Sequence, residues 1–310
     1  MRYVFSILVL FVFSAKVFTQ HFPIYSQYMF DGLAINPAYS GSRGVLSITG
    51  SYRDQWAGFP GAPVTQTFSI HAPLKKRSIA LGLLLSKDEI GITEKYSVYG
   101  NYAFRFRIGK GWFSLGIRGG LNIIQYEWEK IETSVPNDIT FPNITHSYNL
   151  PNFGTGFYYQ SDKFYIGASI PFLLSYHEKS SENGYEMYHD ISNYNILGTA
   201  GFLLNISENF KIKPSVLLKY HKNTPLQFDL NAFCLFKDLW IGASYRIDDA
   251  ITPMIKFPFL DWLEIGKLEI GIAYDFSLSE INEFNKTGAL EILFRYELIF
   301  KIRAVNPRYF

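Results

Sequence analysis

The clearest pattern along the chain is a pair of alternating runs that together span residues 226–246. Within each run every second residue is apolar, and a two-residue break, Lys237-Asp238, separates the runs. The positions between the apolar ones include Gln227, Asp229, Asn231, Ser244 and Arg246. Because successive side chains of a strand point to opposite faces, the pattern predicts a hairpin with one apolar and one polar side.

Each run has about the length, roughly 9–11 residues, that a tilted strand needs to cross a bilayer. The carboxylate, amide and guanidinium groups on the second face need water. The hairpin therefore predicts part of a transmembrane barrel, with lipid outside and a hydrated lumen inside.

The same alternation recurs through most of the chain and predicts fourteen strands, an even number as in bacterial outer-membrane barrels. We expect an all-β, antiparallel up-and-down barrel with strands near 44–54, 63–74, 77–87, 92–108, 111–126, 152–160, 163–176, 191–205, 209–222, 226–236, 239–248, 250–257, 266–277 and 287–302.

The connections follow the parity of such a barrel, which has short periplasmic turns and longer outer loops. Tight turns follow even strands, at 75–76, 109–110, 161–162, 207–208 and 237–238, and long connections follow odd strands, at 127–151, 177–190 and 278–286. One segment, 258–265 after the twelfth strand, is long for a periplasmic turn, so either that strand is misplaced or the turn carries an interfacial piece.

The alternative fold is a soluble β-sandwich, in which one face of each strand packs in the core. The turn parity argues against it, and so do the aromatic residues at predicted strand ends, where a membrane interface favours them. These residues are Tyr52, Trp56, Trp112, Trp128, Tyr165, Tyr176 and Trp240.

Composition supports a barrel. The chain is 18% aromatic and 18% charged, against about 25% charged residues in ordinary soluble domains, and its mean hydropathy is only +0.02. Residues 1–19 read as a secretory signal peptide. Its removal leaves 27 basic and 27 acidic residues, so the charge predicts no nucleic-acid partner. We expect an irregular lead-in at 20–43, with folding into the barrel mouth as one option, and the barrel at 44–310.

Catalytic, metal and cofactor sites are not predicted. The six His residues show no zinc spacing, no Gly-x-Ser-x-Gly motif is present, and the glycine-rich piece 116–120 lies within a strand rather than before a helix. The sole cysteine, Cys234, falls on the predicted lipid face as a small apolar residue.

Charged residues on the polar faces form a predicted lumen network. Its members are Arg118, Lys211, Lys213, Lys219, Asp229, Arg246, Glu269, Asp275, Glu291, Arg295 and Glu297. The network either neutralises itself to fill the barrel or lines a binding or conduction path. Its mixed signs argue against a strongly ion-selective pore.

Four ordered motifs near the N-terminus resemble the signature of the PorP/SprF family: Tyr25-Ser26-Gln27-Tyr28-Met29, Asn36-Pro37-Ala38-Tyr39-Ser40-Gly41, Tyr52-Arg53-Asp54-Gln55-Trp56 and Gly61-Ala62-Pro63-Val64-Thr65. Tyr274-Asp275-Phe276 and the ending Asn306-Pro307-Arg308-Tyr309-Phe310 resemble the family more loosely. The chain departs from it at Lys286–Glu291, which keeps only the Gly and Glu of the family's usual run, and at Asn306, where Cys is common.

This resemblance implies a non-enzymatic outer-membrane component or accessory partner of the type IX secretion system of Bacteroidetes. Some family members work with a periplasmic OmpA-like lipoprotein. Others secrete or hold a surface adhesin that bears a type B C-terminal domain, as in gliding motility. The alternative is a passive porin or small-molecule transporter in the same outer-membrane lipid.

A partner-docking surface is predicted from the motif residues and the first outer loop, because exposed aromatic and Arg groups make good interface anchors. The candidates are Gln27, Tyr28, Asn36, Pro37, Tyr52, Arg53, Gln55, Trp56, Gly61 and Pro63. The alternative is a loop folded over the mouth with Arg53 hydrogen-bonded locally. The apolar loop 127–151 is also expected to fold over the mouth or to meet a partner.

Overall fold

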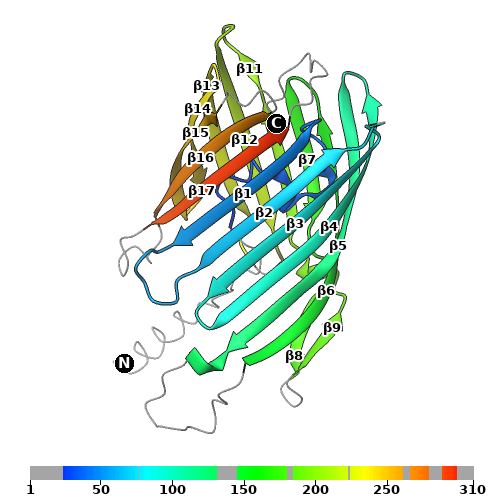
Figure 1. Cartoon of the computed structure of the whole chain (residues 1–310), viewed down its shortest axis with the longest axis vertical. Helices are drawn as coiled ribbons and strands as arrows, with labels where there is room; N and C mark the ends of the chain where they lie inside the picture. Colours follow the sequence, from blue (N-terminus) through cyan, green and yellow to red (C-terminus); the bar gives the residue numbers. More distant parts are fainter. Residues whose placement is uncertain are drawn as a thin grey trace, which may run out of the picture.

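The computed structural model describes residues 24–75, 77–130, 145–179, 184–222, 224–260, 266–278 and 288–298. It is a closed antiparallel β-barrel (Figure 1). The strands are β1 Leu46–Gln55, β2 Val64–Pro73, β3 Ile79–Ile90, β4 Thr93–Ile108, β5 Gly111–Glu127, β6 Thr145–Gln160, β7 Phe164–Ile170, β8 Ser175–Lys179, β9 Gly184–Tyr188, β10 Ile196–Phe202, β11 Leu204–Asn205, β12 Phe210–Tyr220, β13 Gln227–Phe236, β14 Leu239–Arg246, β15 Ala250–Leu260, β16 Gly266–Ser277 and β17 Ala289–Leu298.

Closure of the barrel comes from the pairing of its first and last strands. β1 pairs with β17 from Leu46↔Leu298 to Gln55↔Ala289, and β10 pairs with β12 on the far side of the sheet. β10 and the two-residue β11 form one crossing interrupted at Leu203, so the described chain crosses fourteen times. The fourteen predicted strands are therefore confirmed, each overlapping a crossing strand.

Side chains alternate across the barrel wall as predicted. On β13, Asp229 and Phe233 are fully buried, whereas Leu230 and Phe236 are 47% and 56% exposed on the outer face. Cys234 is also exposed there. The outer face carries an apolar surface on most strands, and no helix among the described residues is long and apolar enough to span a membrane.

The turns fit the expected parity. The short turns lie at the upper end of the barrel in Figure 1, which we call the short-turn end, and the β8–β9 hairpin lies at the other, the long-loop end. Turn geometry is supported locally, because Gly109 and Lys237 adopt positive φ of 57° and 54°, as tight hairpin turns require.

Three predicted boundaries need correction. β6 begins at Thr145 instead of 152, because it continues its ladder with β5 to Glu127↔Thr145. A second hairpin, β8–β9, occupies most of the predicted loop 177–190. β15 runs on to Leu260 through a register shift between Pro258 and Leu260, which shortens the predicted connection 258–265 to residues 261–265.

Three strand-end aromatics do not belong to a membrane-facing belt, contrary to prediction. Tyr165 and Trp240 are 6% and 7% exposed and lie on the inner face. Trp112 stacks against the guanidinium of Arg105, itself buried inside the barrel. The reason lies in what the barrel contains, because these rings meet other apolar or cationic groups there. The C-terminal motif 306–310 and the signal peptide fall outside the described residues.

An outward Leu230→Arg substitution tests the assignment of the lipid face. Leu230 lies near the middle of β13, opposite Val216 and Tyr245. A cation on the lipid side at mid-membrane costs about 2–4 kcal/mol, so the variant should unfold in vesicles at lower urea, while Leu230→Phe should match the wild type. Equal stability of the Arg variant would show that this face meets water.

Candidate functional site

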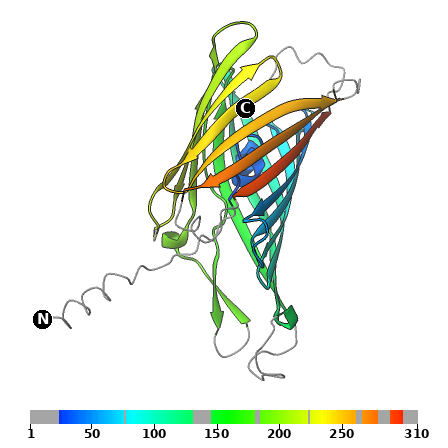
Figure 2. The same cartoon turned by 90° about the vertical axis from the view of Figure 1, so that its left-hand side faces the viewer.

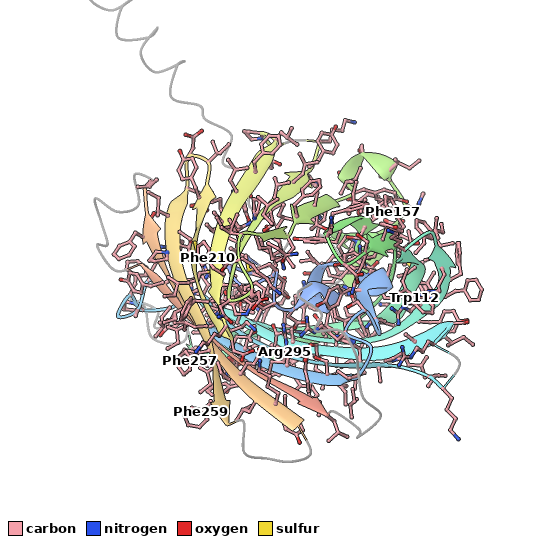
Figure 3. The ribbon with its side chains drawn as sticks, turned by 90° about the horizontal axis from the view of Figure 1, so that it is seen from above. Trp112, Phe157, Phe210, Phe257, Phe259 and Arg295 are labelled. Atoms are coloured by element: carbon pink, nitrogen blue, oxygen red, sulfur yellow. The ribbon has the colours of Figure 1, made fainter. Side chains whose placement is uncertain are left out.

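The N-terminal lead-in fills the interior of the barrel. Residues 24–45, called the inner segment below, include the short helix α2 (Gly32–Ile35) and the 3-10 turn η1 (Pro37–Tyr39). Every residue from 26 to 42 is buried. Looking along the barrel, Figure 3 shows this segment lying inside the ring of strands. The predicted irregular lead-in thus enters the lumen itself.

The Asn36-Pro37 pair shapes the segment and fixes it to the wall. The Asn36 side chain accepts a hydrogen bond from the Ala38 N–H at 2.9 Å, which caps η1, and Pro37 takes the first position of that turn, where its fixed φ suits a helical turn and its missing N–H costs nothing. The same amide donates to the Phe157 carbonyl of β6 at 2.9 Å. The motif is therefore an internal anchor as well as a chain breaker.

One side of the inner segment packs on an apolar part of the inner wall. The Phe30 ring lies 5.2 Å from Phe233 and 5.7 Å from Trp240, both edge-on. Buried wall residues in this cluster are Leu197, Leu217, Phe233, Leu235, Trp240, Met254, Ala273 and Leu293. On this side of the inner segment, apolar side chains fill the part of the lumen that the sequence predicted to be hydrated.

Sequence reasoning missed these inward apolar residues, although the chain carries a signal for them. From Ala232 to Phe236 five successive residues are apolar, so the strand is apolar on both faces. A strand with lipid on one side and water on the other would alternate throughout. A continuous apolar run in a barrel strand instead indicates apolar surroundings on both sides, with lipid outside and packed side chains inside.

At the long-loop end, a buried ion cluster holds the start of the inner segment. Glu291 of β17 accepts hydrogen bonds from the backbone N–H groups of Ser26 at 2.8 Å and Gln27 at 3.0 Å. Arg53 of β1 pairs with Glu291 at 3.3 Å and with Asp275 of β16 at 2.6 Å. The Ser26 hydroxyl completes the arrangement by donating to the Asp275 carboxylate at 2.9 Å.

The cluster continues along the wall from Asp275. Arg246 lies 3.7 Å from Asp275 and 3.0 Å from Asp249. Asp229, fully buried, lies 2.9 Å from Lys219 and 3.4 Å from Arg246. Removing one partner of such a buried pair leaves an uncompensated charge, which costs about 3–5 kcal/mol.

A second ion cluster holds the other end of the inner segment. Arg43 makes a two-pronged contact with Glu297 of β17, with N–O distances of 2.5 and 3.1 Å. Nearby, Lys256 pairs with Glu269 at 2.6 Å. The Lys256 ammonium also lies 5.1 Å from the Phe30 ring, within cation–π range.

The remaining predicted lumen residues contact the inner segment or the barrel wall around it. Arg118 donates to the Leu33 carbonyl of α2 at 2.6 Å, and Arg295 lies 3.7 Å from Glu269. The buried Lys213 ammonium lies 5.3 Å from the Tyr165 ring, and Lys211 is half-buried on the same face. The carboxylates of the predicted network lie beside cations, whereas Arg118 and Lys213 contact a carbonyl oxygen and an aromatic ring, so a mutually neutralising network describes only part of the set.

The predicted docking residues separate into two groups. Gln27, Tyr28, Asn36, Pro37 and Arg53 are buried inside the barrel, so they do not form an exposed surface. Arg53 is hydrogen-bonded locally, as the alternative interpretation stated.

The other docking candidates lie on the outer face or at the long-loop end. Tyr52 is 42% exposed on the outer face of β1. Gln55, Trp56, Gly61 and Pro63 belong to the first outer loop, which is closed by a Gln55 N–H to Pro63 carbonyl bond of 3.0 Å. Trp56 N–H donates to the Gly288 carbonyl at 2.9 Å, which ties this loop to the start of β17.

Glycines in the wall make room for the inner segment. A Cβ built on Gly116 of β5 would collide with the backbone of Ala38, and one on Gly156 of β6 would collide with the Asn36 side chain. Backbone can approach backbone this closely only where no side chain intervenes. Gly116 and Gly156 thus form the part of the wall against which the chain's own N-terminal segment packs.

A cavity of about 20 Å³ lies between Tyr28, Tyr39, Tyr158, Tyr165 and Lys213, room for about one water molecule. The fold and interior together define a transmembrane β-barrel whose lumen is occupied by its own N-terminal residues.

Comparison with known proteins places the chain more closely. The family described as type IX secretion system membrane protein PorP/SprF matches residues 17–296, and the chain belongs to this family. It is accordingly a multi-pass outer-membrane protein and a membrane component of type IX secretion, as its sequence predicted. No curated protein sequence matches the chain.

Solved barrels resemble the chain only in outline. The CymD monoaromatic hydrocarbon channel is 12% identical, with 89% of this chain and 93% of that chain covered and a TM-score of 0.47. Omp33 of Acinetobacter baumannii is 9% identical, with coverages of 84% and 100% and a TM-score of 0.45. A Pseudomonas aeruginosa FadL homologue is 11% identical, with coverages of 89% and 94% and a TM-score of 0.44. Likeness at this level carries no argument about function.

Gly116→Val should displace the inner segment, because its side chain would occupy the position of the Ala38 backbone. Gly100→Val is the matched control, since its Cβ would point outward with its nearest neighbour, the Gly119 carbonyl, 3.8 Å away. We expect limited proteolysis to cleave within residues 26–42 in the Gly116 variant but not in the control. Protection of the segment in both variants would contradict the close packing described here.

Proposed function

We propose that this protein is a non-enzymatic accessory component of type IX secretion that helps to secrete or anchor a surface protein. Its membership of the PorP/SprF family supports a role as a membrane component of that system. The occupied lumen is the structural observation that favours a protein-handling role over free solute passage. A passive porin needs a water-filled channel, whereas residues 26–42 are buried throughout the centre of this barrel.

The cargo in this proposal is an adhesin with a type B C-terminal domain, connected with gliding or adhesion. A periplasmic OmpA-like lipoprotein is the proposed partner on the other side of the membrane. Both follow from the family resemblance. The long-loop end is the side that would meet the cargo, since long connections of such barrels face outward. Within it, the first outer loop with Gln55, Trp56, Gly61 and Pro63 remains the proposed docking surface.

Liposome swelling separates this function from the porin alternative. The purified wild-type barrel should admit small sugars no faster than empty liposomes, because the inner segment and its ion pairs close the lumen. A variant lacking residues 24–42 should admit them readily. Rapid flux through the wild type would favour a passive porin and count against the partner role.

Deletion of the gene tests the secretion role directly. Without this protein, a surface protein that bears a type B C-terminal domain should be lost from the cell surface, as measured by surface proteomics. Re-expression of the wild type should restore display. A Trp56→Ala variant should restore it only partly, because it removes the indole ring that we propose as a contact for the cargo, with Trp56→Phe as control. Unchanged display of every such protein after deletion, in a strain lacking paralogues too, would refute the role.

A further inference from the structure

The wall of the barrel is much taller on one side than on the other. β4, β5 and β6 contain 16, 17 and 16 residues, more than the roughly 9–11 that cross a bilayer, whereas β14 has 8. Figures 1 and 2 show this wall extending at the long-loop end. The outer face of β6 is apolar in its second half, where Phe153 and Phe157 are 54% and 38% exposed. It is polar at its start, where Thr145, Ser147 and Asn149 are exposed. Residues 145–149 therefore stand beyond the lipid.

The extension of β6 has a strand on one side only. β5 pairs with it from Thr145 to Gln160, but β7 reaches only as far as Thr155. Beyond that point the Phe153 carbonyl accepts the Leu173 N–H at 2.9 Å, and the Pro151 carbonyl accepts the Tyr176 hydroxyl. From 145 to 149, no other strand of the described ranges pairs with this edge.

The backbone groups that face this edge can be identified. In an antiparallel strand the N–H and C=O of one residue point the same way, and the direction alternates along the strand. Because the Phe153 and Pro151 carbonyls point away from β5, those of Asn149 and Ser147 do too. Pro151 fits the same geometry, since its missing N–H falls on the edge side, where the β5 ladder does not need it.

Natural proteins usually protect exposed edges with charge, bulges or short strands. Residues 145–150 contain no Asp, Glu, Lys or Arg, and the register with β5 runs without a shift. The inner side of the extension is aromatic instead. The Tyr148 ring lies 4.8 Å from Tyr185 of β9, whose hydroxyl is 2.6 Å from that of Tyr126.

We infer that the β6 edge at residues 145–149 binds an extended strand of the secreted partner by β-augmentation. Only another extended backbone can pair with Ser147 and Asn149 at once, and the alternating faces would select apolar side chains toward Tyr148 and polar ones outward. The inference rests on the proposed function, because it assigns that function's cargo to this edge. It predicts recognition by main-chain groups more than by side chains.

The test uses the purified full-length barrel in detergent and, as probe, the purified C-terminal domain of the surface protein lost on gene deletion. Ser147→Pro/Asn149→Pro removes two edge N–H groups and spares the β5 ladder. We expect at least about tenfold weaker binding, since each hydrogen bond contributes modestly. The matched Ser147→Ala/Asn149→Ala variant keeps both N–H groups and should bind as the wild type does. Heat-modifiable gel mobility confirms that each barrel is folded.

Each result of the binding experiment distinguishes one explanation from the others. Wild-type affinity in the proline variant overturns the edge site while leaving the secretion role intact. An equal loss of binding in the alanine variant shows that the side chains are recognised, and it also overturns the edge site. Light scattering that gives a wild-type dimer and a proline-variant monomer assigns the edge to a second copy of this chain. Failure of the wild type itself to bind the domain removes the cargo role, and the edge assignment with it.

Discussion

Burying a charge without a partner is costly, and the ion pairs that meet this requirement inside the barrel hold both ends of the inner segment. Glu291 accepts hydrogen bonds from the backbone N–H groups of Ser26 and Gln27 and also pairs with Arg53. Arg43 meets Glu297 at the opposite end of the segment. Desolvation makes each unpaired ion costly, so the segment is held at both ends by groups that would be unstable without it.

Between these two ends, apolar packing and hydrogen bonds to the wall hold the segment, including the bond from Arg118 to the Leu33 carbonyl. Phe30 packs against Phe233 and Trp240, and glycines at 116 and 156 let the backbone of the segment approach the wall. Ion pairs at the ends, together with apolar contacts and hydrogen bonds in the middle, give the segment one register along the barrel axis. Such a filled lumen differs from that of porins, in which polar walls enclose water.

The sequence predicted the wall far better than the interior. Alternation around Leu230 and Cys234 reports what each face of a strand contacts, so strand number, turn parity and facing followed from it. The contents of the lumen depend on contacts across more than 200 residues, such as Ser26 with Glu291, which no local period encodes. Arg53 illustrates the limit, because its chemistry suited an exposed anchor and its position on the inner face made it a buried ion-pair partner. The apolar residues Phe233 and Leu235 at inward positions were the one local signal in the sequence that the lumen is filled.

Ser26 and Gln27 touch both strands that complete the cylinder, Arg53 on β1 and Glu291 on β17. Those strands are the first and the last to be made, and the inner segment precedes β1 in the chain. Once β1 and β17 have paired, a folded segment cannot enter the barrel from the side. If the N-terminal residues are seated while the sheet is still open, they bring Arg53 and Glu291 to one shared partner and so guide the pairing of β1 with β17.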